Sequence, residues 1–173
     1  MYRAKIRIEW TPKQFGVRNR TMPSQQIAID FVAYDREGRV VLLAEAKNRR
    51  GTSEQWAAGL RRNMLAHGVL PRTEYFLIVT PERIYTWKQS GANEVDAAPE
   101  FSIDAARVLE PYFQKLHQEP AKIWPEAFKL LVLTWLTDLA RAAEREPGHD
   151  PSSAWLSELA ASLKGAHIDL NSV

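Results

Sequence analysis

The sequence predicts an α/β fold with a mixed central sheet flanked by helices. Two adjacent segments rich in β-branched and aromatic residues are separated by a turn-like cluster that ends in Gly38. A helical pattern and two more short apolar segments follow them. The chain has 173 residues, of which 45% are apolar, so it can form one substantial hydrophobic core.

The first two predicted strands form an antiparallel hairpin. They span residues 26–34 (QIAIDFVAY) and 39–47 (RVVLLAEAK), and the turn between them would pair Tyr34 with Arg39. Upstream, residues 3–10 are compatible with either a short strand or a helical turn.

A helix and two further strands complete the predicted core. The helix runs from Thr52 to about His67, because Trp56, Leu60 and Met64 recur four residues apart on one face. The two strands that follow span residues 75–80 and 83–88.

The C-terminal part is predicted to be a helical extension, residues 101–173, on a core of residues 1–100. Helical patterns cover residues 102–117, 125–146 and 152–164. We expect this extension to pack on the core or to mediate oligomerisation. One helical face carries five apolar residues expected in the core or a subunit interface: Trp124, Phe128, Leu131, Trp135 and Leu139.

The composition excludes several classes of site. The chain has no cysteine, which rules out disulfides, thiolate metal sites and cysteine nucleophiles, and its four histidines lack ligand spacing. No glycine-rich loop with Lys-Ser/Thr is present to bind nucleotide phosphates. The N-terminus lacks a secretory pattern, and the apolar run 128–139 is shorter than the roughly 20 residues that span a bilayer. We therefore expect a cytoplasmic protein without a membrane partner.

The charge is distributed unevenly along the chain. Residues 1–72 contain 14 Lys/Arg and 6 Asp/Glu, whereas residues 73–173 contain 9 and 15. A basic segment of this kind favours a polyanionic partner. The alternative is that folding intermixes the charges of the two segments.

Three charged residues on the predicted hairpin are candidates for chemistry. Side chains alternate along a strand, so Glu45 and Lys47 share a face, and the expected register places Asp30 opposite Leu43 on that same face. The two carboxylates would then lie diagonally and could bind one Mg²⁺. Such alternation is also typical of a solvated strand face, but both strands are otherwise apolar, and buried carboxylates require a partner.

Asp30, followed by Glu45-Ala46-Lys47 on the second hairpin strand and then by a helix and a third strand, resembles the PD-(D/E)XK nuclease superfamily over residues 1–90. The resemblance implies a restriction endonuclease-like core in which Asp30, Glu45 and the Ala46 carbonyl bind Mg²⁺, or Mn²⁺ in its place. Lys47 would assist the attacking water. Ile29 stands where the family motif often has proline.

Two further positions have a possible role by resemblance and an ordinary alternative. Gln55 resembles a helix glutamine that orients the active site in the branch related to the RecB nuclease domain, although Gly59 stands where that branch has tyrosine. Thr52 to Gln55 also fits a helix capping box. Glu9 lies where many members carry an additional acidic ligand, and its alternating neighbours equally suit a solvated charge.

Four arginines follow the catalytic strand and are candidate phosphate contacts: Arg49, Arg50, Arg61 and Arg62. Guanidinium groups suit phosphate oxygens, although a single surface arginine is more often only solvated. Their clustering beside the candidate metal site favours the phosphate role.

The sequence thus predicts a Mg²⁺-dependent DNA endonuclease in defence, restriction or DNA repair. Cutting of both strands would favour a homodimer, and a partner protein could supply specificity. Two alternatives stay open. The first is a nucleic-acid-binding or assembly module without catalysis on the same fold, and the second is a DNA-junction resolvase.

Overall fold

The computed structural model describes residues 29–67, 71–88, 97–142 and 154–171. The strands are β1 (Phe31–Tyr34), β2 (Val40–Ala46), β3 (Tyr75–Val79), β4 (Arg83–Lys88), β5 (Phe101–Asp104) and β6 (His167–Leu170). The helices are α1 (Glu54–His67), α2 (Ala106–Lys115), α3 (Pro125–Ala142) and α4 (Ala154–Ser162). The expectations for residues 3–10 and for Glu9 lie outside the described residues.

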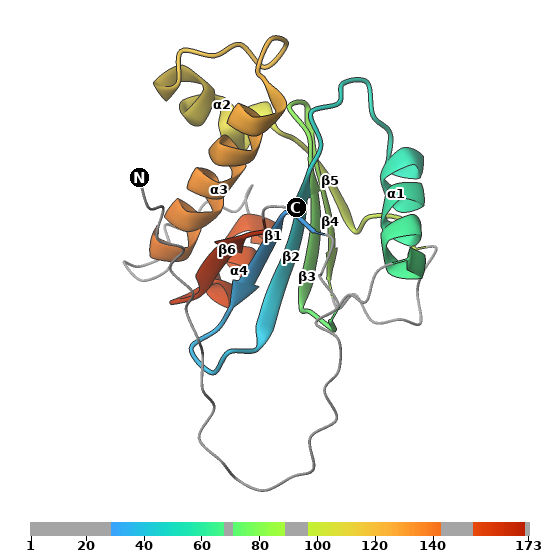
Figure 1. Ribbon diagram of the computed structural model, residues 1–173, viewed down its shortest axis with the longest axis vertical. Helices are drawn as coiled ribbons and strands as arrows, with labels where there is room; N and C mark the ends of the chain where they lie inside the picture. Colours follow the sequence, from blue (N-terminus) through green and yellow to red (C-terminus); the bar gives the residue numbers. More distant parts are fainter. Residues whose placement is uncertain (1–28, 68–70, 89–96, 143–153, 172–173) are drawn as a thin grey trace, which may run out of the picture.

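The strands form one six-stranded sheet in the order β5-β4-β3-β2-β1-β6 (Figure 1). Only β2 and β3 are parallel, and α1 joins them as the crossover that a parallel pair requires. The other neighbours are antiparallel. The expected α/β class with a mixed sheet is confirmed.

The hairpin forms as expected, but its register was predicted wrongly. Tyr34 lies opposite Val40 instead of Arg39, and a bulge falls between Ala33 and Tyr34. The turn is longer than predicted because Asp35 closes it, accepting the backbone N–H of Arg39 on Oδ1 at 2.8 Å. The pairing therefore shifts by two residues, which keeps each side chain on its predicted face.

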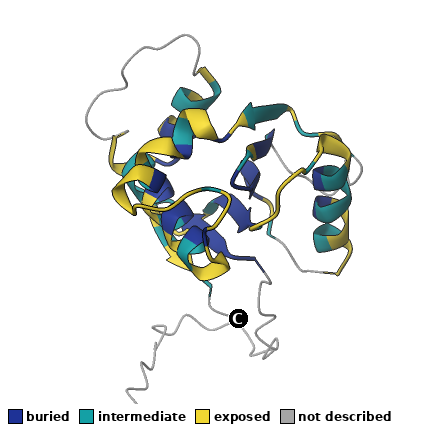
Figure 2. Cartoon of the chain, turned by 90° about the horizontal axis from the view of Figure 1, so that it is seen from above, coloured by how far each residue is buried: buried dark blue, intermediate teal, exposed yellow. Residues whose placement is uncertain are grey.

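The helices cover the two faces of the sheet unequally (Figure 2). On one face, Leu43, Phe76 and Trp87 form a buried cluster that packs against α1. On the other face, the larger cluster includes Ala44 and Leu77 and packs against α2, α3 and α4. The hydrophobic core thus lies in two layers, with β2 and β3 buried between them.

The segment expected to be helical also contains two strands of this sheet. β5 occupies the start of the predicted helix 102–117, and Asp104 ends it by accepting the N–H of Ala106 on Oδ1 at 3.0 Å. β6 follows α4 and pairs with β1 at the sheet edge. The C-terminal residues therefore complete the sheet as well as cover it.

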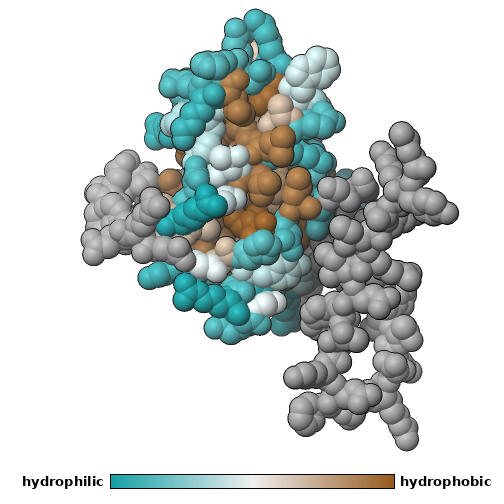
Figure 3. Space-filling model, turned by 60° about the vertical axis from the view of Figure 1, so that its left-hand side comes forward, coloured by the Kyte–Doolittle hydropathy of each residue, from teal (hydrophilic) through white to brown (hydrophobic). Residues whose placement is uncertain are grey.

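The helical side of the molecule keeps an apolar surface. Figure 3 shows a band of apolar side chains on the side that carries α3. Among the described residues, the exposed large hydrophobic side chains include Leu116 at 47% and Leu130 at 56%. Within the same residues, no helix has the length and hydropathy needed to cross a membrane.

Candidate active site

Asp30 and Glu45 meet at one end of the hairpin. Asp30 immediately precedes β1, and Glu45 is the next-to-last residue of β2. Because Phe31 pairs with Ala44, continuation of the register places Asp30 directly opposite Glu45 rather than opposite Leu43. Both carboxylates are buried, with exposed fractions of 4% and 6%. They are therefore closer neighbours than the diagonal arrangement that the sequence predicted.

Backbone hydrogen bonds across the hairpin hold both carboxylates. Glu45 Oε2 accepts the backbone N–H of Asp30 at 3.1 Å. In return, Asp30 Oδ2 accepts the backbone N–H of Ala46 at 2.9 Å. Each carboxylate is thus fixed by the main chain of the opposite segment, which preorganises the pair.

Two lysines neutralise the pair. Lys47 Nζ lies 2.5 Å from Glu45 Oε1, as expected for residues two apart on one strand face. Lys129 Nζ, from α3, lies 2.5 Å from Asp30 Oδ1. Sequence reasoning missed Lys129, since a contact between residues so far apart depends on the tertiary fold. The sequence showed only that Lys129 is a charged residue within the apolar helical run 128–139.

Electrostatics at the site reflect burial and these ion pairs. Burial raises the pKa of Glu45, and the nearby Asp30 charge raises it further, whereas Lys47 opposes the shift. The hydrogen bond to Asp30 raises the pKa of Lys129, so its ammonium stays charged at neutral pH. Two negative and two positive groups therefore balance one another.

The oxygen donors of this site suit one type of metal ion. Mg²⁺ commonly binds one or two carboxylates and keeps its other positions for water and phosphate. Asp30 and Glu45 supply such a pair. Among the described residues, no three His, Cys, Asp or Glu side chains are placed to hold a metal together. In the described residues, the groups that could take part in holding a cation are therefore the carboxylates of Asp30 and Glu45 alone, without a third acidic or histidine ligand.

Gln55 is exposed in the first turn of α1. The helix cap is Ser53, whose Oγ accepts the N–H of Trp56 at 3.2 Å. Thr52, the cap that the sequence predicted, instead bonds through its hydroxyl to the hydroxyl of Tyr85 at 2.9 Å. The cap is therefore one residue later than predicted, with Trp56 instead of Gln55 at the third helical position, and a role for Gln55 at the active site stays a prediction.

The four arginines are in different environments. Arg61 is 1% exposed, and its guanidinium lies over the rings of Phe76 and Trp87 at 5.8 and 5.4 Å. Burial removes Arg61 from the predicted phosphate surface. Arg50 is exposed and pairs with Glu82 at 2.8 Å.

The other two arginines remain on the surface. Arg49 lies over the ring of Trp56 at 5.4 Å, and Arg62 is exposed on α1. Arg49, Arg50 and Arg62 therefore stay candidates for phosphate contact.

An exposed tryptophan stands near the site. Asn48, directly after Lys47, donates from Nδ2 to the Ile123 carbonyl at 2.7 Å. Trp124 follows and is 75% exposed, which contradicts the predicted core position, whereas the alternative of a subunit interface stays a prediction. It precedes α3 rather than lying on its apolar face. Lys129 lies five residues after Trp124, which corresponds to about 7.5 Å along the axis of α3 at the usual helical rise.

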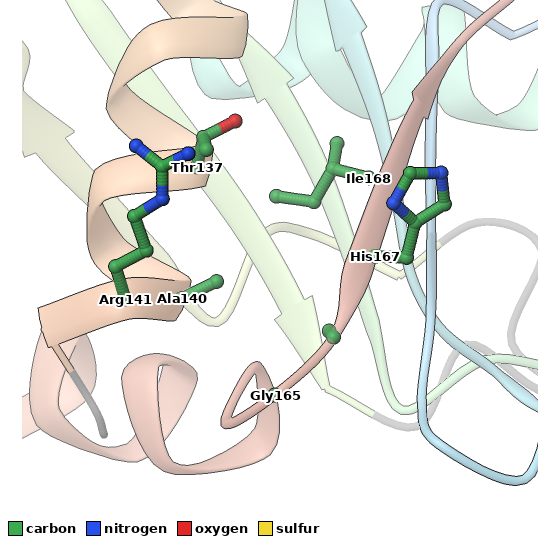
Figure 4. A pocket seen from close by; sticks show the side chains of 7 residues that line it. Thr137, Ala140, Arg141, Gly165, His167 and Ile168 are labelled. Atoms are coloured by element: carbon green, nitrogen blue, oxygen red, sulfur yellow. The ribbon is translucent and has the colours of Figure 1, made fainter.

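A cavity of about 360 Å³ lies away from these residues, between the end of α3 and β6 (Figure 4). Thr137 and Arg141 line it from α3, and Ile168 lines it from β6. His167, also in its wall, pairs with Tyr34 at the far end of β1 from Asp30. The cavity therefore does not belong to the carboxylate site.

The chain matches no protein-family model, and comparison with curated proteins and with solved structures also finds no match.

Proposed function

We propose that this chain is a metal-dependent deoxyribonuclease with a restriction endonuclease-like, PD-(D/E)XK site. Asp30 and Glu45 would bind Mg²⁺ or Mn²⁺, and Lys47 would assist the attacking water. One observation carries the proposal: two buried carboxylates face each other at the end of a hairpin, and the lysine of the E-x-K triplet contacts one of them.

Burial argues against the ordinary interpretation of these charges. A solvated strand face would leave the carboxylates in water, whereas they are 4% and 6% exposed. Buried ion pairs seldom stabilise a fold more than apolar residues would, and leaving one partner unpaired costs about 3–5 kcal/mol. Because such a buried charged cluster adds little to stability, its presence around Asp30 and Glu45 favours a functional role for these residues.

The chain's own groups can perform distinct parts of phosphodiester hydrolysis. A bound Mg²⁺ would supply Lewis-acid polarisation of a phosphate oxygen and a more acidic water. Asp30 and Glu45 supply the charge to hold a cation, and their backbone hydrogen bonds fix their positions. Lys47, half-buried beside Glu45, can donate a hydrogen bond to water at the site. Hydrolysis would join the water oxygen to phosphorus and break one P–O ester bond.

Surface residues near the site suit a nucleic-acid partner. Arg49 and Arg50 follow Lys47 after Asn48 and are exposed, so they could contact phosphates. Trp124 offers an exposed indole on which an unpaired base could stack. Lys122, two residues earlier, is also exposed. Cations interleaved with an aromatic ring favour single-stranded or distorted DNA as the substrate.

A non-catalytic DNA-binding module on the same fold is the second candidate. It is favoured by the fact that every oxygen of both carboxylates has a hydrogen-bond or ion-pair partner without a metal. Under this alternative, the cluster would only tie α3 to the hairpin. A junction resolvase, a homodimer, a specificity-supplying partner and a role in defence or repair stay predictions.

A cleavage assay tests the proposal. The purified chain is incubated with supercoiled, linear and branched DNA in Mg²⁺, Mn²⁺ or chelator. We expect metal-dependent products, which Asp30→Asn, Glu45→Gln and Lys47→Met abolish. Each loss should exceed about 100-fold, which is the lower end of a general acid–base contribution.

Glu37→Gln serves as the matched control, because Glu37 is an exposed carboxylate in the hairpin turn whose ion pair is with Arg39. This variant should cleave as the wild type does. Full cleavage by Asp30→Asn would contradict the proposed site. DNA binding without any product in either metal would favour the non-catalytic module.

A further inference from the structure

The four oxygens of the two carboxylates are already occupied by protein groups. Glu45 Oε1 and Oε2 contact Lys47 Nζ and the backbone N–H of Asp30. Asp30 Oδ1 and Oδ2 contact Lys129 Nζ and the backbone N–H of Ala46. A divalent cation can bind this pair only if at least one of these partners withdraws or shares its oxygen.

The partners differ in how easily they can move. The two N–H groups belong to the hairpin main chain, so their displacement would disturb β1 and β2. Lys47 follows β2, and its own backbone N–H donates to the Val79 carbonyl at 2.9 Å. The side chain of Lys47 is 42% exposed and equally flexible, but it begins two residues from Glu45 on the same strand face, so Lys47 remains beside the carboxylate pair.

Lys129 is the partner best able to leave. It comes from α3, a separate element, and its side chain is 39% exposed. A lysine has a flexible four-carbon stem and three rotatable donors, so its ammonium can move to solvent while the helix stays in place. Lys129 also contacts the more buried of the two carboxylates, where a second cation would be repelled.

We propose that Lys129 is a displaceable counter-ion that occupies the cation position on Asp30, and that its ammonium leaves when a divalent cation binds. The proposal rests on the metal site of the proposed function and adds a competitor from outside the E-x-K triplet. Lys129 would then be free to contact a phosphate oxygen of bound DNA.

This exchange couples metal binding to nucleic-acid binding. A phosphate that takes the Lys129 ammonium removes the competitor from Asp30, so DNA should raise the affinity for the metal. Linkage requires that the metal raises the affinity for DNA by the same factor. Lys129 would therefore affect metal binding indirectly, through its contact with the Asp30 carboxylate, and would not bind the metal itself.

Calorimetric titration with Mn²⁺ tests the exchange without reference to cleavage. Lys129→Gln and Lys129→Met, which keep most of the stem but remove the charge, should bind Mn²⁺ at least about fivefold more tightly than the wild type does, the low end of typical couplings. Lys129→Arg should not gain affinity. Lys115→Gln is the matched control, because Lys115 is an exposed lysine at the end of α2 that lies over the ring of Tyr112, and it should bind Mn²⁺ as the wild type does.

Thermal unfolding provides a second measurement. In chelator, both neutral variants should unfold at a lower temperature than the wild type, because Asp30 loses its ammonium partner. Saturating Mn²⁺ should raise their unfolding temperatures more than that of the wild type. A purely structural ion pair predicts the loss in chelator without the larger gain in metal.

Three outcomes are decisive. Tighter Mn²⁺ binding by Lys129→Gln or Lys129→Met, with no gain in Lys129→Arg, supports the exchange. Equal or weaker binding by both folded neutral variants overturns it while leaving the nuclease proposal intact. Failure of the wild type and both variants to bind Mn²⁺ would overturn the exchange together with the proposed metal site.

Discussion

Asp30 and Glu45 have similar burial but different ties to the rest of the molecule. Glu45 pairs with a lysine two residues away on its own strand, whereas Asp30 pairs with a lysine from α3. The local pair could be predicted from strand alternation alone. The long-range pair depends on how α3 packs, which no local pattern encodes.

Glu45 should make stability depend on pH. Burial raises its pKa above the ordinary value of 4.5, so Glu45 binds a proton more readily in the folded state than in the unfolded state. The favourable contribution of the neutral carboxyl is fully present below pH 4.5 and is lost as the pH rises through the raised pKa. The free energy of unfolding of the wild type, relative to Glu45→Gln, should therefore fall across that window.

Urea unfolding of both proteins in chelator, from about pH 4 to about pH 8, measures this difference. Glu37→Gln again provides the comparison for an exposed carboxylate. Parallel curves for the wild type and Glu45→Gln would show that Glu45 does not titrate differently in the folded state.

Arg61 should contribute to stability rather than to DNA binding. Its guanidinium lies between α1 and the sheet, over Phe76 and Trp87. Desolvated cation–π contacts are worth about 2 kcal/mol or more, so Arg61→Ala should lower the free energy of unfolding by at least that amount. The neighbouring, exposed Arg62→Ala should change it by no more than about 0.5 kcal/mol. Urea denaturation of the two variants compares them, and equal losses would contradict the assignment.

At the scale of the element, α1 shows why Arg61 was misplaced. The sequence stripe of Trp56, Leu60 and Met64 indicated the buried face, yet these three residues are half-buried. The most buried positions are Ala57 and Arg61, one turn apart. The buried face of α1 is thus shifted by about one residue from the apolar stripe. The shift is possible because the Arg61 side chain packs against the rings of Phe76 in β3 and Trp87 in β4.

The strands illustrate how far local patterns can predict structure. The long, apolar β2 and β3 were predicted closely, because their β-branched and aromatic composition is distinctive. β5 and β6 have four residues each, lie at the sheet edges and alternate polar with apolar residues. Whether such a short edge segment forms a strand depends on its pairing with a neighbouring strand. Its local sequence therefore does not distinguish it from the adjoining helices and loop.

The segment before α3 should contribute to DNA binding through Trp124. Stacking of one base on an aromatic side chain is worth about 1–3 kcal/mol, so Trp124→Ala should weaken binding of single-stranded DNA by about fivefold to 150-fold. Trp124→Phe should retain part of the affinity. Leu130→Ala removes an exposed apolar side chain of the following helix and should leave affinity unchanged.

Fluorescence anisotropy with a labelled single-stranded oligonucleotide, in chelator to prevent cleavage, measures these affinities. Equal binding by Trp124→Ala and the wild type would remove Trp124 from the nucleic-acid surface. A change in the oligomeric state of Trp124→Ala, with unchanged DNA affinity, would instead assign the indole to a protein contact.

At the scale of the whole molecule, folding mixes the basic and acidic segments at specific points. Lys129 of the acidic segment pairs with Asp30 of the basic one, and Glu82 pairs with Arg50. The Arg50–Glu82 pair cancels one charge of the majority sign in each segment, whereas the Lys129–Asp30 pair joins the minority charges and leaves both net charges unreduced. The uneven charge along the sequence overstated the positive potential available to DNA, although the exposed Arg49 and Arg62 still carry part of it.

The sheet also brings the last described strand to the first. β6 pairs with β1 along its length, and the backbone N–H of Asn171 donates to the Asp30 carbonyl at 2.8 Å. During synthesis on a ribosome, the hairpin emerges long before residue 171. Until then, the backbone groups of β1 that pair with β6 have no strand partner. The end of the sheet that carries Asp30 and Glu45 is then completed only after residues 167–171 have left the ribosome. Under the proposed nuclease function, polypeptides that still lack β6 should accordingly cleave little DNA of the cell that makes them.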